Sequence, residues 1–562
     1  MRYNARMLQR IAILLTFCVC FTSRASAQAT HPSAPSKDLN ILWLSVEDMS
    51  PWLACYGDKT APTPNIDRLA REGVRYTNAF ATTPVCAPAR HTIITGMYAT
   101  STGAMHMRNV SRGSMAKHHL ATAYAGIPLY EAVPAPAVRC FPEYLRAAGW
   151  YATNNAKTDY QFTPPPTAWD ESSGRAHWRN RKDGQPFFAV FNCTFTHEGQ
   201  AFPDAQRRGD IVKPADVKVP PYYPDTPTVR DTLAQTYNNI AAMDGWVGER
   251  LAELEKDGLL DSTIVVFFSD HGVGLPRGKR APYDSGVRVP LIVRFPDGKA
   301  AGTTDERLVS FIDWAPTALS LAGIKPPAYL RGVPFLGSYV GDAPKYAFAT
   351  ADRMDAAKDT IRAVTDGRYK YVHNFRLEIP HLPPLAYRDN LAMMRDIEAL
   401  RNSGKASAEQ WQIVSTSKPR EEFYDTQTDP HEVTNVIDAP EHQPRVKAMR
   451  AALEQWMKDT NDLGHIQPET KLVKEKLWPP DGVQPTTATP QGTVSPAGEG
   501  KGTLTIVCET DGASIGYRRK GERAWSVYVE PVPVEPDVAY EVVAHRIGFE
   551  RSSITTASAG RL

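Results

Sequence analysis

The sequence predicts an α/β protein with a mostly parallel central sheet, a smaller α+β subdomain and a small β-sandwich module. In the first half, apolar runs alternate with helical patterns, which is typical of a parallel sheet covered by helices. The chain has 562 residues. Single hydrophobic cores stop growing at roughly 250 to 300 residues, so more than one unit is expected. A proline-rich stretch separates a final segment of short alternating runs.

Four apolar runs predict the main strands of the sheet, and their nearly continuous apolar character fits strands buried on both faces. The runs are Asn40–Val46, Gly149–Thr153, Pro186–Phe195 and Thr263–Phe268. A helix is expected from Pro64 to Glu72, opened by Thr63 and closed by Gly73. A second helix, from about Val229 to Lys256, has apolar residues at helical spacing and ends before Gly258.

Changes in composition predict the domain boundaries. Residues 38–340 form the larger α/β domain, and residues 341–478 form a smaller α+β subdomain packed on it. Residues 479–502 are rich in proline, threonine and glycine, a composition typical of a linker. Residues 503–562 predict a small β-sandwich, because short alternating runs at 503–508, 513–517, 525–529 and 540–544 are separated by turn residues.

The first 27 residues are typical of a secretory signal peptide. Three arginines precede the apolar run from Ile11 to Phe21, which leads to the small-residue cleavage pattern Ala25-Ser26-Ala27. A membrane anchor is the alternative, but the run is shorter than the ~20 residues that span a bilayer. We expect a secreted or periplasmic protein with no transmembrane segment after cleavage. Five cysteines then remain, an odd number that leaves at least one thiol unpaired.

The charge balance disfavours a surface that wraps a polyanion. The chain has 64 basic and 62 acidic residues, a net charge of +2. An anionic ligand must therefore be recognised by a local site rather than by a global field, and no nucleic-acid partner is indicated.

Polar residues follow each of the four predicted strands. Taken alone, each would more often be a helix cap or a loop residue. Because ligands gather at the carboxyl ends of strands in open α/β sheets, four such ends together predict an active site. The residues are Glu47 and Asp48, Lys157 and Asp159, His197, and Asp270 and His271.

The three acidic residues of this set predict a site for a hard divalent cation. Calcium is held by several carboxylate and carbonyl oxygens, which Glu47, Asp48 and Asp270 supply. His271 is a less typical calcium ligand, and its nitrogen leaves zinc or manganese open.

Cys86 lies at the expected start of another helix, with Pro88 two residues later and Arg90 one turn later. The free amide groups and the dipole of a helix N-terminus favour negative charge at this point. The pattern therefore predicts either a nucleophilic cysteine or an anion pocket.

Cys86, Pro88 and Arg90, with the later Thr95-Gly96, resemble the signature of the formylglycine-dependent sulfatases. The acidic pair, the segments Thr63–Ala70 and Ser269–Gly272, and Gly278-Lys279 leading to Arg288–Val293 agree with it. The resemblance covers residues 38 to about 480 and implies an alkaline-phosphatase-like fold. Within the family, Thr102–His106, Met354-Asp355 and Phe423–Asp425 look like the heparan N-sulfatase (sulfamidase) branch.

The resemblance implies roles for these residues. A maturation enzyme oxidises Cys86 to formylglycine (3-oxoalanine) during export, and its hydrated form attacks sulfur. The calcium ligands would be position 86 together with Glu47, Asp48, Asp270 and His271. Arg90 orients the diol, while Lys157, Lys279 and His197 bind sulfate and stabilise charge on the leaving atom.

Two positions depart from the family pattern. The chain has Glu47-Asp48 where Asp-Asp is common, and Lys157-Thr158-Asp159 where Lys-x-His is common. A carboxylate beside a bound sulfate would repel it, so we expect Asp159 to contact the sugar. The resemblance also suggests that four residues form a basic rim for an anionic sugar: His106, Arg353, Arg362 and His373.

The predicted function is hydrolysis of a sulfuric ester or sulfamate, with release of sulfate from a sulfated saccharide. One alternative is a phosphodiesterase or phosphonate hydrolase of the same superfamily. Another is a non-catalytic protein that binds sulfated glycans through its C-terminal module. Because the predicted linker separates that module from every motif, we expect it to be dispensable for hydrolysis of a small substrate.

Overall fold

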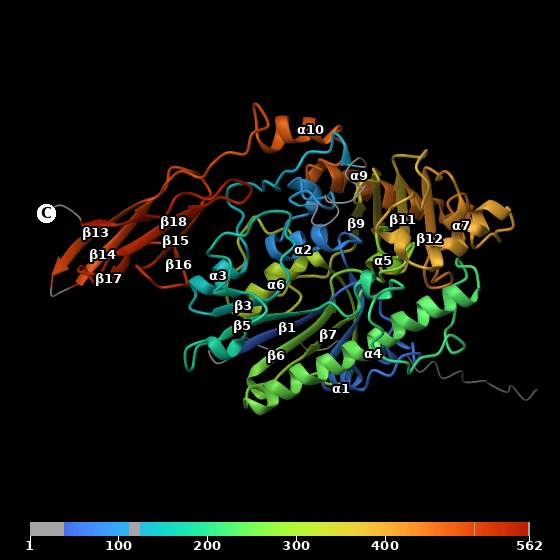
Figure 1. The fold of residues 1–562 in the computed structure, drawn as a ribbon, viewed down its shortest axis with the longest axis horizontal. Helices are drawn as coiled ribbons and strands as arrows, with labels where there is room; N and C mark the ends of the chain where they lie inside the picture. Colours follow the sequence, from blue (N-terminus) through green and yellow to red (C-terminus); the bar gives the residue numbers. More distant parts are fainter. Residues whose placement is uncertain (1–38, 112–123, 499–500, 560–562) are drawn as a thin grey trace, which may run out of the picture.

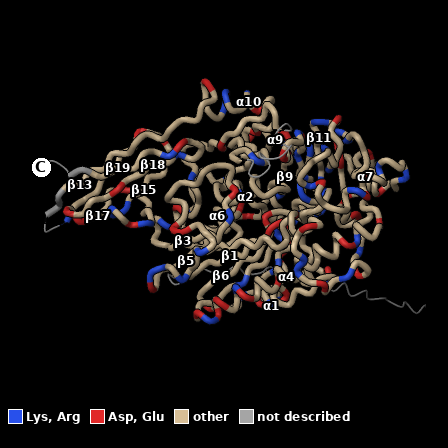
Figure 2. The backbone as a smooth tube through the Cα atoms, viewed as in Figure 1, with Lys and Arg blue, Asp and Glu red and all other residues tan. Residues whose placement is uncertain are grey.

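The computed structural model describes residues 39–111, 124–498 and 501–559. The predicted signal peptide, residues 1–27, lies outside these ranges. In Figure 1 a central α/β part lies between the C-terminal β module at one end and a smaller subdomain at the other. Across the described ranges no helix is long and apolar enough to cross a membrane. Figure 2 shows both signs of charge interspersed along the chain.

The central sheet confirms the predicted mostly parallel architecture. Its eight strands lie in the order β4-β3-β5-β1-β6-β7-β2-β8, and only β7 runs antiparallel to its neighbours. The bounds are β1 (Asn40–Val46), β2 (Val74–Phe80), β3 (Tyr151–Asn155), β4 (Glu171–Ser172), β5 (Phe187–Cys193), β6 (Thr263–Ser269), β7 (Leu291–Arg294) and β8 (Thr303–Ser310). All four predicted strands lie within two residues of these bounds at each end, and the strand expected from Gly149 to Thr153 runs from Tyr151 to Asn155.

Helices cover both faces of the sheet (Figure 1). Side chains alternate along a strand, so Leu42 and Leu44 of β1 pack toward α1 and α4, whereas Ile41 and Trp43 pack toward α2, α3 and α6. The bounds are α1 (Pro64–Glu72), α2 (Cys86–Thr95), α3 (Pro142–Ala147), α4 (Pro227–Lys256), α5 (Asp284–Val287) and α6 (Trp314–Leu321). Helix α4 starts two residues before its predicted start, because the Thr226 hydroxyl caps it by accepting from the Val229 amide at 3.2 Å.

The smaller subdomain is built on a four-stranded antiparallel sheet in the order β12-β11-β10-β9. Its elements are β9 (Ala347–Ala351), β10 (Ile361–Thr365), β11 (Tyr369–Asn374), β12 (Glu421–Asp425), α7 (Met393–Ser403), α8 (Trp411–Val414), α9 (Gln443–Asp459) and α10 (Glu469–Leu472). Helix α9 packs on this sheet through Val446, Met449 and Leu453. This arrangement agrees with the α+β subdomain expected after residue 340.

The C-terminal module is a sandwich of two four-stranded sheets, in the orders β17-β14-β13-β20 and β16-β15-β18-β19. Its strands are β13 (Gln491–Gly498), β14 (Lys501–Val507), β15 (Ser514–Arg519), β16 (Ser526–Tyr528), β17 (Val532–Val534), β18 (Tyr540–His545), β19 (Thr555–Thr556) and β20 (Ser558–Ala559). The two sheets share a core that includes Leu504 and Val542.

The predicted linker, residues 479–502, was partly wrong. Strand β13 lies inside it and pairs antiparallel with β14, with Gln491 opposite Val507. Pro496 sits where the register of this pair shifts, a position at which a strand tolerates proline. The proline-rich composition therefore predicted a linker in a region whose second half, from Gln491, is already part of the β module.

The module is packed against the larger α/β domain rather than tethered to it. Ile547 is 3% exposed and belongs to the main hydrophobic core. The Trp478 indole donates to the Gly548 carbonyl at 3.0 Å, and Arg546 donates to the Pro134 carbonyl at 3.1 Å. The Arg146 guanidinium joins Asp170 of the α/β domain to the Trp525 carbonyl. These contacts argue against the expectation that the module is dispensable.

We expect Ile547→Ala to lower the free energy of unfolding by about 2–5 kcal/mol, because the substitution opens a cavity where the module meets the main core. Urea unfolding followed by tryptophan fluorescence measures the change. Ile554→Ala is the matched control, since Ile554 is 44% exposed and its truncation leaves no buried cavity. Equal stability of the two variants would contradict a structural role for this contact.

Candidate active site

Polar side chains from the ends of two parallel strands and the start of one helix converge at one edge of the central sheet. Glu47 and Asp48 follow β1, Asp270 and His271 follow β6, and Cys86 is the first residue of α2. All five are buried. They meet because the carboxyl ends of parallel strands lie at the same edge of a sheet. The structure therefore brings together the residues that the sequence placed at separate strand ends.

Cys86 occupies the centre of this cluster. Its Sγ atom lies 3.4 Å from His271 Nε2 and 3.7 Å from Asp48 Oδ1. The residue before it, Val85, is extended and offers no side-chain cap to the helix. The N-terminus of α2 therefore presents its amide groups and the positive end of its dipole at position 86. This arrangement favours an anionic group there.

Asp48 connects the cluster to Lys279. Its Oδ1 lies 2.9 Å from His271 Nε2, and its Oδ2 lies 2.6 Å from Lys279 Nζ. Its backbone amide donates to Asp270 Oδ1 at 3.1 Å. Asp48 also has φ 51°, a left-handed backbone conformation that is uncommon for a non-glycine residue and is frequent at functional sites.

The electrostatics keep these groups charged despite burial. Burial opposes ionisation of Asp48, but Lys279 and His271 outweigh it and hold the pKa of that carboxyl well below its usual range. Burial likewise opposes ionisation of Asp270, and His271 and Arg90 together lower its pKa. Burial disfavours the charged form of His271, yet Asp270 and Asp48 raise its pKa to about 10. The site therefore holds ionised carboxylates away from bulk water.

Glu47 organises the outer side of the cluster. Its Oε2 lies 2.8 Å from Lys157 Nζ and 3.8 Å from His197 Nε2. The Nδ1 atom of His197 accepts a hydrogen bond from the Gly199 amide at 3.1 Å. Burial, followed by the charge of Lys279, lowers the pKa of His197, so the ring is neutral at pH 7. A neutral ring whose Nδ1 is an acceptor carries its proton on Nε2.

Arg90 lies one turn after Cys86 and joins α2 to the strand ends. Its Nε donates to Asp270 Oδ2 at 3.0 Å, and one terminal nitrogen donates to Asn192 Oδ1 at 2.7 Å. Asn192, near the end of β5, did not figure among the predicted site residues. A polar residue inside an otherwise apolar strand was the signal that could have indicated it.

The geometry of the cluster fits a divalent cation. Two overlapping sets place one ligand atom from each residue within 4.8 Å of the others: Glu47, Asp48, Cys86 and His197, and Asp48, Cys86, Asp270 and His271. Among the described residues, none forms a hydrogen bond with the buried Glu47 Oε1, although a buried carboxylate oxygen normally has a partner. His271 Nδ1 faces the Gly272 carbonyl at 2.9 Å, which leaves Nε2 to face the carboxylates. A donor set rich in carboxylate suits a hard cation.

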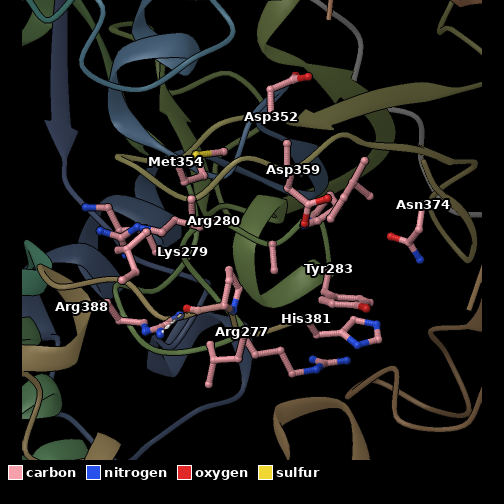
Figure 3. A pocket seen from close by; sticks show the side chains of 18 of the residues that line it. Arg277, Lys279, Arg280, Tyr283, Asp352, Met354, Asp359, Asn374, His381 and Arg388 are labelled. Carbon is pink, nitrogen blue, oxygen red and sulfur yellow. Dashed lines mark hydrogen bonds between the residues drawn. The ribbon is translucent and has the colours of Figure 1, made fainter. Parts of the chain in front are cut away.

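Lys279 and Arg280 are fixed by Glu198, which sequence reasoning missed. Glu198 Oε2 lies 3.9 Å from Lys279 Nζ, and both of its oxygens accept from Arg280, at 2.7 and 2.8 Å. Behind them lies a small cavity of about 40 Å³, with Lys279 and Arg280 toward one end and Tyr283 and His381 toward the other (Figure 3). Glu198 and Arg280 are each adjacent in sequence to a predicted residue.

Three predicted residues form the mouth of the site. The side chains of Lys157, Asp159 and His197 are 22%, 38% and 26% exposed, whereas the centre is closed. Asp159 Oδ2 lies 3.8 Å from Lys157 Nζ. Its φ of 56° again falls in the left-handed region. Asp159 is therefore placed where it can meet the part of a ligand that remains outside the centre.

The predicted basic rim was wrong, because its arginines are buried in the fold. Arg362 is 0% exposed and is paired with both Asp352 and Asp462. Arg353 is buried against Glu469, and its backbone amide donates to His106, which is also buried. His373 lies opposite Arg362 on β11 and contacts the Tyr371 hydroxyl. Arg353, Arg362 and His106 are therefore enclosed in the fold and not open to a ligand, while His373 is half-buried.

We expect Arg362→Ala to destabilise the protein by about 3–5 kcal/mol, because it leaves Asp352 and Asp462 buried without a countercharge. Thermal unfolding measures the effect. Arg368→Ala is the matched control, since the Arg368 side chain is 49% exposed and ion pairs at the surface contribute about 0–1 kcal/mol. A change in substrate preference without a loss of stability would contradict this assignment and restore Arg362 as a ligand contact.

Comparison with known proteins agrees with the geometry. A sulfatase family model matches residues 39–324, and a model of the C-terminal part of N-sulphoglucosamine sulphohydrolase matches residues 276–378. An ulvan-active sulfatase of Formosa agariphila is 40% identical over 100% of this chain and 99% of its own length. The chain belongs to the sulfatase family.

Two further likenesses place this sulfatase near the sulfamidase branch and confirm its fold. The human N-sulphoglucosamine sulphohydrolase is 26% identical over 78% of the chain and 94% of its own length. A solved structure in complex with D-glucosamine-2-N,6-O-disulfate superposes with a TM-score of 0.52 at 19% identity, covering 76% of this chain and 99% of its own. The architecture of the sulfatase is thus alkaline-phosphatase-like, as expected from the resemblance.

Proposed function

We propose that this sulfatase releases sulfate from a saccharide, as an ester or a sulfamate, by means of a formylglycine made from Cys86 and a bound calcium ion. The observation that carries the proposal is the position of Cys86, at the N-terminus of α2 and within 3.7 Å of Asp48 and His271. Relatives named as ulvan-active sulfatase and N-sulphoglucosamine sulphohydrolase support a sugar substrate.

The nucleophile comes from position 86. Formylglycine supplies, as its hydrate, an oxygen nucleophile where the thiol now lies. Arg90 is held by Asp270 and Asn192 and fixes a positive charge beside this position, which orients the diol. Conversion of Cys86 requires a maturation enzyme as a partner, and the signal-like first 27 residues are consistent with export to the periplasm or beyond.

Glu47, Asp48, Asp270 and His271 would hold the cation, together with an oxygen on residue 86. A divalent cation polarises an oxygen of the bound sulfate and favours deprotonation of a neighbouring hydroxyl. Three of the four side chains are carboxylates, which favours calcium. The imidazole of His271 makes zinc or manganese the alternative.

Lys157, Lys279 and His197 would bind the sulfate and the leaving atom. The two lysines contact different carboxylates of the cluster: Lys157 contacts Glu47, and Lys279 contacts Asp48. Both are fixed by these ion pairs, so they stabilise negative charge on sulfate without reorganising. The neutral His197, with its proton on Nε2, donates a hydrogen bond to the oxygen or nitrogen that leaves.

A substrate panel tests the proposal. Purified protein, co-expressed with a maturation enzyme, is incubated with N-sulfoglucosamine, O-sulfated monosaccharides, ulvan oligosaccharides and an aryl sulfate, and free sulfate is measured. We expect at least one sulfated saccharide to exceed the aryl sulfate in kcat/KM, because remote sugar contacts orient the reacting group. A higher rate on a phosphate diester than on every sulfate would overturn the proposal.

A further inference from the structure

A second basic group lies at the mouth of the active site, outside the residues that face Cys86. The side chain of Arg108 is 23% exposed, and its Nε donates to Asp355. Its guanidinium lies over the ring of Tyr387, 5.6 Å from the ring centroid. None of the motifs in the sequence indicated Arg108 or Tyr387.

Two chains of contacts hold Arg108 beside the reacting groups. On one side, the ring of Tyr387 lies 6.4 Å from that of His197. On the other side, Asp355 Oδ2 lies 3.6 Å from a terminal nitrogen of Arg280, which follows Lys279. Arg108 is therefore connected to His197 through Tyr387, and to Arg280, the neighbour of Lys279, through Asp355.

The ion pair of Arg108 leaves its terminal guanidinium N–H groups available to a ligand. In the part of the chain that the structure describes, its one hydrogen-bonded ion pair, to Asp355, uses the Nε edge. Asp355 is 3% exposed and shared with Arg280, so it holds Arg108 in place without covering it. Arg108 and Asp355 both have left-handed backbone conformations, φ 63° and 50°, which cluster at ligand sites.

We propose that Arg108 binds an anionic substituent, a carboxylate or a second sulfate, on the saccharide whose sulfate lies at Cys86. The planar guanidinium matches two oxygens of either group. Asp355 and Tyr387 are positioning residues that fix the direction of the guanidinium. This proposal rests on the proposed function and narrows its substrate to sugars with at least two negative charges.

The experiment compares matched substrates that differ by one negative charge. One pair is N-acetyl-D-glucosamine 6-O-sulfate and D-glucosamine 2-N,6-O-disulfate. The other is a sulfated disaccharide containing a uronic acid, before and after reduction of its carboxyl group. The variants are Arg108→Gln, Arg108→Lys and, as the matched control, Arg519→Gln, which breaks an exposed ion pair with Glu535 in the β module.

We expect Arg108→Gln to lower kcat/KM for the more highly charged member of one pair by roughly 10- to 100-fold, chiefly through KM. This loss of kcat/KM should be at least tenfold larger than the loss for the less charged substrate of the same pair, by the same reasoning. The affected pair identifies carboxylate or sulfate as the bound group. The kcat/KM of Arg108→Lys should lie between those of the wild type and Arg108→Gln, because lysine keeps the positive charge but lacks the planar set of N–H donors of arginine. Arg519→Gln should match the wild type throughout.

Equal losses on both members of both pairs would overturn the subsite. Thermal unfolding of each variant separates this result from misfolding, and a folded Arg108→Gln variant with unchanged KM would also overturn it. A wild type that releases sulfate from the aryl sulfate but from no saccharide would instead refute the proposed function, and with it the subsite. The two failures are distinguishable, because only the second is visible in the wild type.

Discussion

Cys86→Ala abolishes sulfate release and leaves the fold intact. The side chain of Cys86 is buried at the centre of the cluster, and no other described cysteine lies there. Alanine has no group that can be oxidised to an aldehyde, so the nucleophile is lost and not merely weakened. Because the nucleophile is lost, we expect turnover, measured by sulfate release, to fall to the level of an enzyme-free blank. The site keeps its charges, so we expect the fold to stay intact.

Mass spectrometry of the peptide that contains position 86 completes this test. Active wild-type protein should show the thiol replaced by an aldehyde or its hydrate. Cys140→Ala is the matched control, since Cys140 is also buried but lies in the main hydrophobic core. Fully active protein that contains only unmodified cysteine at position 86 would contradict the mechanism.

Asp270→Asn lowers activity by more than roughly 100-fold and lowers the content of bound cation. Substituting a residue that only contacts a metal ligand already lowers metal affinity or activity by about 10- to 100-fold. Asp270 is proposed to contact the ion itself, so we expect a larger effect. The substitution also removes the negative charge that Arg90 contacts at 3.0 Å. Elemental analysis of the purified variant, beside kcat/KM on the preferred substrate, measures both effects.

Asp261→Asn serves as the control for this substitution, because Asp261 is 91% exposed and is paired with Arg294 far from any proposed ligand. Wild-type protein should contain about one equivalent of calcium. One equivalent of zinc without calcium would contradict the choice of metal. An inactive Asp270→Asn variant with full cation content would show that Asp270 only positions Arg90.

Local patterns in the sequence were sufficient for the elements that build the sheet. The run Asn40–Val46 is β1 without a change of bounds, and Pro64–Glu72 is α1. These predictions depend on short-range rules, namely continuous apolar strands and a proline at the helix start. The motif from Cys86 to Arg90 was equally local, since one helical turn places both residues on the same side of α2.

Interactions between distant residues were beyond local patterns. The arginines of the supposed rim, Arg353 and Arg362, are paired with carboxylates about 116 and 100 residues later in the chain, so their burial depends on packing that no local pattern reports. For the same reason the proline-rich segment concealed β13, whose partner strand follows it.

The sequence by itself determined the fold class, the family and the set of charged residues at the strand ends, because these follow from periodicity and from residue types at fixed spacing. Only the tertiary structure decided which charges converge. It placed Asn192 and Glu198 beside the predicted centre, Arg108 at its mouth and Ile547 of the β module in the main core. The physical reason is that burial and ion pairing are properties of neighbours in space, which a single chain of residue types does not specify.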